Sequence, residues 1–209
     1  MERIVYLHGF ASGPSSSKAR CFRRRLAAEG FSVAVPDLSE GNFEGLTLSR
    51  QLRVIGNAAG GGNAALIGSS MGGYLAALYA SRHADVERIV LLAPAFGFAR
   101  RWAERMGTDA VEAWRLEGAI DVFHYAEGRN RALGYQLLED AAQYEDYPDV
   151  HQPCLIFHGI HDDTVPVRYS QEFAASRPNV ELHAVDSGHE LLNVLDAMGD
   201  RIVAFLRGQ

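Results

Sequence analysis

Short continuous runs of apolar residues alternate with segments of helical periodicity along most of this chain, and this alternation constrains the fold more than any other feature. Apolar runs of this kind are typical of strands that are covered on both faces. Strands separated by helices imply a parallel sheet with right-handed crossovers, so we expect an α/β fold with a doubly wound sheet. The expected strands are 4–7, 31–35, 64–67, 88–92, 154–157 and 180–185, and the expected helices are 17–29, 46–55, 71–83, 167–175 and 191–206.

One long segment breaks the alternation. Residues 96–150, 55 in number, contain no convincing buried parallel strand, and this length is too great for a simple connection. We therefore expect a core formed by 1–95 and 151–209, with 96–150 inserted as a cap or lid subdomain. The expected parts of the insertion are helices near 99–106, 109–117 and 136–144 and a short hairpin around 120–125.

The composition indicates one globular domain and argues against a nucleic-acid partner and a membrane span. A chain of 209 residues, 47% hydrophobic, is long enough for one sizeable core. Its 20 Lys and Arg against 26 Asp and Glu provide no basic field, so we expect no nucleic-acid partner. The longest apolar stretch, 89–99, falls short of the ~20 residues of a spanning helix, so we expect no membrane span. We see no leader sequence after Met1. The two cysteines, Cys21 and Cys154, form neither a disulfide framework nor a metal cluster. We therefore expect a cytoplasmic location.

The candidate chemistry begins at residues 68–72, which read GSSMG. A serine on a tight turn between a strand and a helix requires glycine two positions before and two after it, because the turn is strained and other backbone comes close. The pattern alone is a weak signal. Here it lies between the expected strand 64–67 and the helical segment that starts at Met71. This position makes Ser70 the candidate nucleophile.

A serine hydroxyl needs a histidine base, and the base needs a carboxylate that orients it. Asp162 follows the run 154–157, at the carboxyl end of an expected strand, where ligand chemistry collects in open α/β sheets. We therefore assign Asp162 as the acid, with Asp163 and Asp186 as alternatives. His189 follows the last expected strand and completes the chain order serine, acid, histidine, so it is assigned as the base.

Backbone amides are expected to stabilise the oxyanion that forms during acyl transfer. One is the amide of Met71, directly after the nucleophile and at the positive end of its helix. The other is expected from the loop 8–14 after the first strand. We assign Phe10 to this role, with Ala11 as the second choice.

The remaining histidines are interpreted mainly as structural residues. His8 and His158 each precede a glycine at the end of an expected strand, and we expect them to bond loop backbone rather than transfer protons. His161 is expected at the mouth of the site, as a substrate-binding residue. No histidine pair has the H-E-x-x-H arrangement, so no metal site is expected.

Taken together, these segments resemble the serine α/β-hydrolase superfamily. The resemblance is carried by HGF at 8–10, GSSMG at 68–72, HG at 158–159 with Asp162 and the VP pair at 165–166, and His189. It covers essentially the whole chain apart from the insertion. The resemblance implies Ser70 as nucleophile, Asp162 as acid and His189 as base, with ester or thioester hydrolysis and no cofactor.

A narrower resemblance is to small bacterial esterases of the YqiA and YcfP kind. It rests on YLHGF at 6–10, on Ser12, Pro14, Ser17, Lys18 and Ala19, and on GSSMGGY at 68–74. The superfamily pattern most often starts with additional edge strands, whereas this chain starts at the strand with the His-Gly loop. A mostly parallel sheet of about six strands is therefore implied.

Aromatic residues are concentrated in the expected cap. Residues 96–150 hold 9 of the chain's 20 aromatic side chains. Such enrichment over the carboxyl ends of the strands suggests an apolar acyl pocket, and Phe98 and Trp102 are its candidate substrate-binding residues. The alternative is that these aromatics form the small core of the cap itself.

Negative charge is concentrated in the same segment. Residues 96–150 carry 6 basic and 11 acidic side chains, whereas the rest of the chain carries 14 and 15. An acidic lid is expected to disfavour anionic acyl chains and to favour neutral esters. The basic residues between Lys18 and Arg25 are interpreted as one solvated helix face or, alternatively, as a site for an anionic leaving group.

The sequence therefore favours a serine hydrolase that acts on a small-molecule acyl ester, or on an acyl thioester, through an acyl-enzyme intermediate. Two alternatives stay open. One is a small peptidase or amidase on the same scaffold, and the other is a hydrolase-like binding protein without activity. The sequence makes no prediction of oligomeric state.

Overall fold

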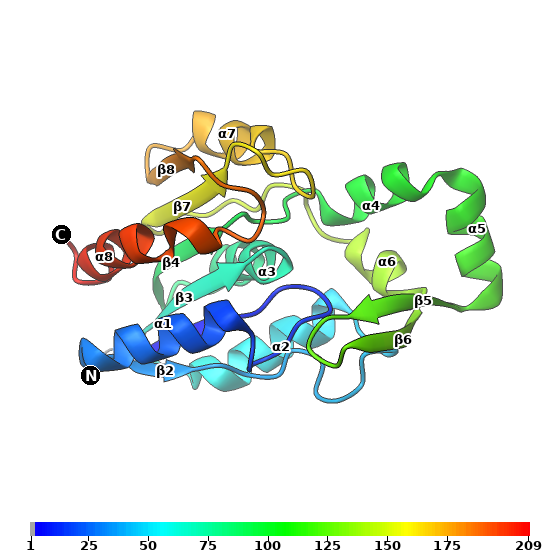
Figure 1. The fold of residues 1–209 in the computed structure, drawn as a ribbon, viewed down its shortest axis with the longest axis horizontal. Helices are drawn as coiled ribbons and strands as arrows, with labels where there is room; N and C mark the ends of the chain where they lie inside the picture. Colours follow the sequence, from blue (N-terminus) through cyan, green and yellow to red (C-terminus); the bar gives the residue numbers. More distant parts are fainter. Residues whose placement is uncertain (1–2) are drawn as a thin grey trace.

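A six-stranded parallel sheet forms the centre of the molecule (Figure 1). The computed structural model describes residues 3–209, so Met1 and Glu2, which enter the predicted core segment and the expectation about a leader, lie outside it. The strands lie in the order β2-β1-β3-β4-β7-β8. Their bounds are β1 (Arg3–Leu7), β2 (Ser32–Ala34), β3 (Ala64–Ser69), β4 (Val86–Leu92), β7 (Cys154–Gly159) and β8 (Val180–Val185). The predicted α/β sheet of about six strands is confirmed.

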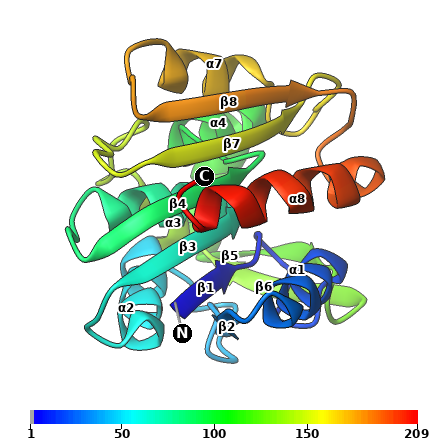
Figure 2. The ribbon, with the colours of Figure 1, turned by 90° about the vertical axis from the view of Figure 1, so that its left-hand side faces the viewer.

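Helices cover both faces of this sheet (Figure 2). Side chains of β1 alternate between the two layers: Ile4 and Tyr6 pack on one side, Val5 and Leu7 on the other, and all four are fully buried. A strand that is buried on both faces has no solvent-facing positions, which is why the sequence shows continuous apolar runs. One layer consists of α1 (Ser17–Ala28) and α8 (Leu195–Leu206), and the other contains α2 (Leu48–Ala59), α3 (Met71–Ala80) and α7 (Arg168–Ala175).

Capping residues determine where several helices begin and end. The side chain of Ser16 accepts a hydrogen bond from the Ala19 amide at 3.3 Å, and Thr47 does the same for the Arg50 amide at 3.1 Å. Helix α2 runs on to Gly60, which has a φ of +72° and ends the helix in the left-handed region. The predicted helix 46–55 was therefore too short at its carboxyl end.

The segment between β4 and β7 contains the expected helices and an antiparallel hairpin. Its elements are α4 (Phe98–Met106), α5 (Thr108–Glu117), β5 (Ala119–His124), β6 (Arg129–Gly134) and α6 (Gln136–Ala141). The hairpin expected around 120–125 corresponds to β5 alone, and β6 extends it to 134. Figure 1 shows these elements beyond the ends of the parallel strands. Trp114 and Leu133 from this segment belong to the same hydrophobic cluster as Tyr74 of α3, so the segment shares the main core.

The sheet order reverses beside β1, because the chain first adds β2 on one side of this strand and then β3 on the other. The loops that follow β1 and β3 therefore diverge at this point. A crevice forms where such loops separate, at the carboxyl ends of the strands. Among residues 3–209, none of the helices combines the length and the apolar character needed to cross a membrane.

Candidate active site

Ser70 lies on the turn between β3 and α3, with a φ of +54°. A non-glycine residue is strained in this region of backbone conformation, and the turn is stable only because the surrounding structure holds it in place. The Ser70 amide donates to the Leu92 carbonyl of β4 at 2.8 Å, and the Ser70 carbonyl accepts from the Ala95 amide at 3.0 Å. Neighbouring backbone from β4 thus fixes the turn on both sides.

The two glycines of the motif are required by close backbone contacts. A Cβ atom on Gly68 would lie 2.2 Å from the carbonyl oxygen of Gly72. A Cβ atom on Gly72 would lie 2.2 Å from the carbonyl oxygen of Leu7, at the end of β1. The steric reason for glycine at both positions, predicted from the motif, therefore agrees with the observed geometry.

The structure brings Ser70, His189 and Asp162 together from three different loops. The Nε2 atom of His189 lies 3.0 Å from Ser70 Oγ, and its Nδ1 atom lies 2.7 Å from Asp162 Oδ2. A carboxylate can only accept at Nδ1, so Nδ1 carries a proton and Nε2 is free to accept one from the serine hydroxyl. This arrangement is able to generate a nucleophilic serine.

The carboxylate of Asp162 is fully buried and strongly hydrogen-bonded. Its Oδ1 atom accepts from the amides of Thr164 at 2.9 Å and Val165 at 2.7 Å. Burial acts to raise the pKa of Asp162, but the hydrogen bonds from His158, His189 and the Val165 amide outweigh burial and hold the pKa well below its usual range. Asp162 is therefore ionised at neutral pH.

His158 contacts the loop that carries Asp162. Its Nδ1 atom lies 2.7 Å from Ser170 Oγ, and its Nε2 atom lies 2.7 Å from the Val165 carbonyl and 3.2 Å from Asp162 Oδ2. A group that donates to a carbonyl and a carboxylate through one nitrogen positions both of them. The contacts match the structural role expected for His158.

The two alternative acids point elsewhere. Asp163 is exposed, and its Oδ1 atom accepts a long hydrogen bond of 3.3 Å from Thr164 Oγ1. Asp186 is also exposed and lies 2.9 Å from His161 Nε2. Neither carboxylate forms a hydrogen bond or ion pair with His189, whose carboxylate partner is Asp162.

Phe10 and Met71 are the two residues predicted to donate backbone amides to the oxyanion. Phe10 and Met71 both line the same cavity as Ser70. The Met71 amide is the first of α3, where helix N–H groups have no partner within the helix. In the described part of the chain, neither amide donates to a backbone or side-chain acceptor. Both are thus free to donate to an oxygen bound in the cavity.

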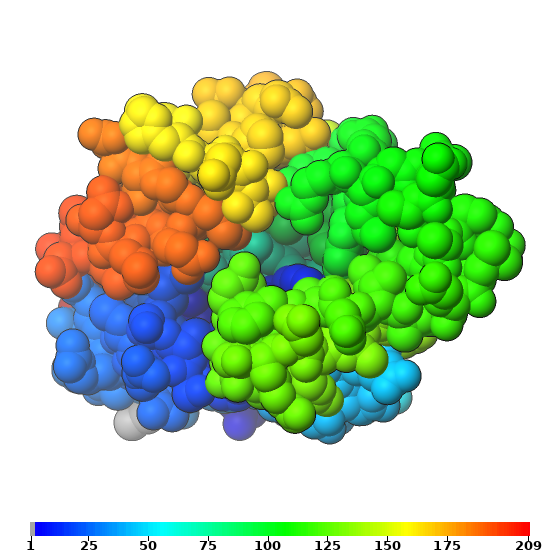
Figure 3. All heavy atoms as spheres, turned by 45° about the vertical axis from the view of Figure 1, so that its right-hand side comes forward, coloured from blue at the N-terminus to red at the C-terminus, as the bar shows by residue number. Residues whose placement is uncertain are grey.

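A cavity of about 420 Å³ opens beside Ser70. In Figure 3 the surface is hollowed between the segment that follows β4, in green, and the loops after β7 and β8, in yellow and orange. Phe98 and Trp102, predicted to bind substrate, both line this cavity, and the rings of Phe10 and Trp102 meet edge to face with centroids 5.1 Å apart. His161, the third predicted substrate-binding residue, is not among the lining residues, because its exposed side chain turns toward Asp186.

The aromatic residues of the insertion divide between the two expected roles. Phe98 and Trp102 line the cavity, whereas Trp114 and Phe96 are completely buried in the core. Tyr125 is 76% exposed and takes part in neither. The pocket and the core of the segment therefore share this aromatic set.

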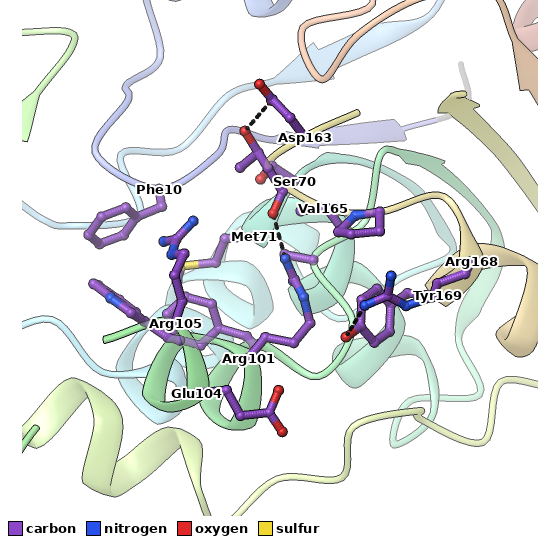
Figure 4. A pocket seen from close by; sticks show the side chains of 15 residues that line it. Phe10, Ser70, Met71, Arg101, Glu104, Arg105, Asp163, Val165, Arg168 and Tyr169 are labelled. Carbon is purple, nitrogen blue, oxygen red and sulfur yellow. Dashed lines mark hydrogen bonds between the residues drawn. The ribbon is translucent and has the colours of Figure 1, made fainter. Parts of the chain in front are cut away.

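Sequence reasoning missed the basic lining of the cavity. Arg101 and Arg105 on α4 and Arg168 at the start of α7 all line it (Figure 4). The sequence did contain a signal for this lining. Arg101 and Arg105 are four residues apart and alternate with Phe98 and Trp102, and this spacing places all four side chains on one face of a helix. The acidic total of residues 96–150 therefore does not describe the charge at the cavity, and the expectation of an acidic lid over the pocket is corrected.

Lys18 also departs from its expected place on a solvated helix face. Its side chain is 10% exposed, and its Nζ atom lies 3.4 Å from Glu190 Oε2. Burial lowers the pKa of Lys18, and Glu190 acts in the opposite direction. The ion pair links α1 to the residue that follows His189.

Comparison with known proteins agrees with this geometry. A model of an uncharacterised protein family, UPF0227, matches residues 3–207. The chain belongs to the UPF0227 family. This family match confirms the predicted resemblance to YqiA- and YcfP-like proteins, and solved structures confirm the α/β-hydrolase fold. No curated protein gives a significant match to the sequence.

Solved structures share the fold over almost the whole chain. Est1E from Butyrivibrio proteoclasticus, solved with ferulic acid, is 19% identical with a TM-score of 0.85, covering 100% of this chain and 89% of its own. Alpha/beta hydrolase domain-containing protein 10 from mouse is 18% identical with a TM-score of 0.82, covering 99% and 90%. A monoacylglycerol lipase from Paleococcus ferrophilus is 16% identical with a TM-score of 0.78, covering 98% and 93%. These likenesses establish the α/β-hydrolase fold of the UPF0227 chain.

Proposed function

We propose that this protein is a serine hydrolase that cleaves carboxylic esters, with acyl thioesters as chemically related substrates. The observation that carries the proposal is the unbroken chain of hydrogen bonds from Ser70 Oγ to His189, at 3.0 Å, and from His189 to Asp162, at 2.7 Å. The esterase and the lipase among its structural neighbours share the fold on which such chemistry occurs.

The first half of the proposed reaction forms an acyl-enzyme. His189 Nε2 takes the hydroxyl proton of Ser70 as Oγ bonds to the acyl carbon, and the carbonyl oxygen becomes an oxyanion. The amides of Phe10 and Met71 donate to that oxyanion. As the intermediate collapses, the bond to the leaving alcohol or thiol breaks, and the proton on Nε2 passes to it.

The second half repeats these steps with water. His189 takes a proton from water, the hydroxide adds to the acyl carbon, and the carboxylic acid leaves as Ser70 Oγ regains its proton. Asp162 stays ionised throughout and keeps the imidazole in the required tautomer and orientation. No metal or cofactor enters either half of this proposal.

In the same proposal, residues 96–150 act as the cap that supplies the substrate wall. Phe98 and Trp102 of α4 face the cavity that holds Ser70. Aromatic walls of this type bind the apolar part of an acyl chain.

Hydrolysis of 4-nitrophenyl acetate and butyrate tests the proposed function. Ser70→Ala is expected to lower kcat by about a thousandfold or more, because no other group replaces the nucleophile. Ser32→Ala, at an exposed serine of β2, is the matched control and is expected to keep full activity. Equal turnover by the wild type and Ser70→Ala would contradict the proposal, and amide cleavage at rates near those of esters would favour a peptidase instead.

A further inference from the structure

The charged side chains that line the cavity are mostly arginines. Three arginines, Arg101, Arg105 and Arg168, line it together with two carboxylates, Glu104 and Asp163. Glu104 is already paired, because Arg100 Nη1 lies 3.2 Å from its carboxylate. The space beside Ser70 thus carries an excess of positive charge, although residues 96–150 as a whole are acidic.

None of the three arginines forms an ion pair with a carboxylate of residues 3–209. By contrast, Arg100, one residue away, pairs with both Glu104 and Asp146. Arg115 on α5 pairs with Glu112. The arginines on the outer faces of the insertion are therefore paired with carboxylates, whereas the three arginines of the cavity are not.

The contacts that two of these arginines do make hold them in place. Arg101 donates to the Thr164 carbonyl at 2.6 Å, and its guanidinium lies 4.8 Å from the ring centroid of Tyr169. Arg168 lies 4.9 Å from the same ring and donates to the Tyr169 hydroxyl at 3.3 Å. Stacking and carbonyl bonds orient a guanidinium without neutralising it. Burial lowers the pKa of Arg101, and the nearby Arg105 lowers it further.

Arg105 has no hydrogen-bond or ion-pair partner among the described residues. Figure 4 shows its side chain in the same part of the cavity as those of Phe10 and Met71. Arg105 and Arg168 are exposed and Arg101 is half-buried, so their charges repel one another in a partly hydrated space, and an anion in that space would reduce the repulsion. A guanidinium also matches the planar fork of a carboxylate.

We propose that the cavity recognises esters that carry a carboxylate at a distance from the scissile bond, and that Arg101, Arg105 and Arg168, in different parts of the lining, supply the positive charge that attracts this carboxylate. The proposal rests on the proposed ester hydrolysis at Ser70. Three arginines against two carboxylates leave a small positive excess, which suits a monoanion rather than a doubly charged phosphate. Phe98, Trp102 and Tyr169 provide apolar contact for the segment that joins the carboxylate to the ester.

The test compares carboxylate substrates with carboxamide substrates of the same shape. In the acyl arm, 4-nitrophenyl hydrogen adipate is compared with 4-nitrophenyl 5-carbamoylpentanoate. In the alcohol arm, 4-acetoxybenzoate is compared with 4-acetoxybenzamide. We expect kcat/KM for the carboxylate to exceed that for the carboxamide by about tenfold or more in one arm, and that arm identifies the side of the ester that faces the arginines.

The double variant Arg105→Gln/Arg168→Gln is expected to reduce this preference about tenfold to a hundredfold, mainly through the KM of the anionic substrate. Arg115→Gln removes an exposed arginine outside the cavity and is expected to keep the preference of the wild type. Raising the salt concentration from 50 to 500 mM is expected to weaken the preference in the wild type, because the arginines are partly exposed.

Three outcomes overturn the proposal: equal kcat/KM for carboxylate and carboxamide in both arms, a preference for the carboxamide, or a carboxylate preference that the double variant retains. Failure of ester hydrolysis itself would look different, since neither the matched substrates nor 4-nitrophenyl butyrate would be turned over. In that event, calorimetric titration of the folded protein with adipamate and adipamide still tests the carboxylate site. Tighter binding of adipamate supports it, and equal binding overturns it.

Discussion

The charged side chains in two parts of the active site differ in whether the protein itself supplies their partners. On the wall that carries Ser70, the buried carboxylate of Asp162 accepts hydrogen bonds from two amides and from His189. A second part of the lining, the arginine wall, consists of Arg101, Arg105 and Arg168, and these side chains pair with no carboxylate of residues 3–209. The charge of Asp162 thus has partners within the protein, whereas the charges of the cavity arginines would be paired only by a bound anion.

This difference distinguishes groups that hold the catalytic residues in position from groups that recognise the substrate. A group that must hold one geometry through a reaction is best surrounded by fixed partners, because reorganisation during the reaction then costs little. A group that binds substrate must keep its bonding capacity free until substrate arrives. Substitutions on the Ser70 wall should therefore affect kcat and stability, and substitutions on the arginine wall should affect the choice of substrate.

The largest expected effect on this comparison is that of Asp162→Asn. The amide cannot stabilise the charged imidazole and can favour the wrong tautomer, so kcat is expected to fall by about a thousandfold to ten-thousandfold. Asp186→Asn, at an exposed alternative acid, should change kcat less than twofold. Steady-state kinetics with 4-nitrophenyl butyrate measures both, and equal losses in the two variants would remove Asp162 from the mechanism.

The pH profile tests the same wall without substitution. The pKa of Asp162 is held well below its usual range, so this carboxylate stays ionised from pH 5 to 8 and contributes no step to the profile. A general base must be unprotonated to take the serine proton, so kcat/KM is expected to fall about tenfold per pH unit below a single ionisation. A flat profile, or a limb with the slope of two protons, would contradict this assignment.

The lowered pKa of Asp162 also predicts how the stability of the fold changes with pH. A carboxyl group whose folded-state pKa is depressed stabilises the fold above its unfolded pKa, about 3.9. That contribution is lost as the pH falls below this value toward the folded pKa. The wild type should therefore lose more stability than Asp162→Asn on acidification below about pH 4.

A backbone test asks whether the turn at Ser70 depends on its glycines. In Gly72→Ala the new Cβ atom would lie 2.2 Å from the Leu7 carbonyl oxygen, and this backbone atom cannot move without shifting β1. We expect a loss of about 1–3 kcal/mol in the free energy of unfolding, or about 2–4 °C in Tm per kcal/mol. Gly62→Ala, which has nothing within 4 Å of its Cβ position, is the matched control and should leave Tm almost unchanged.

The smallest effects are expected in a direct comparison of the two walls. His158→Ala removes the side-chain donor to the Val165 carbonyl and one of several contacts of the buried Asp162 carboxylate, so the free energy of unfolding is expected to fall by about 1–3 kcal/mol. Arg105→Ala removes an exposed side chain without a polar partner and should cost about 0.5 kcal/mol or less. Urea unfolding measures both, and a larger loss for Arg105→Ala would reverse the comparison.

Much of the fold could be predicted from the sequence because its signals are local. Continuous apolar runs mark strands buried on both faces, and the order of strands and helices leaves few topologies. The loops that carry Ser70, Asp162 and His189 follow strands β3, β7 and β8, so the parallel sheet places them at one edge. The second strand of the hairpin, β6, was not predicted, because its sequence RNRALG mixes charged and apolar residues without a clear period.

The arginine wall could not be predicted from the same kind of signal. The spacing of Arg101 and Arg105 shows that they share a helix face, but only tertiary packing decides whether that face meets a cavity or solvent. The same is true of His161, whose side chain turns to Asp186 rather than to the site. Net charge, summed over residues 96–150, gave no information about which charges face inward.

Covalent labelling with a fluorophosphonate is the most direct test of whether Ser70 is an activated nucleophile, because the reagent bonds to a serine only when that serine is activated. Intact-mass and peptide analysis should find one adduct per chain, located on Ser70, with no labelling of Ser70→Ala and much slower labelling of His189→Gln. Ser32→Ala should label as fast as the wild type. An unlabelled wild type, or an adduct on a different residue, would contradict the account of Ser70 as a nucleophile activated by His189 and Asp162.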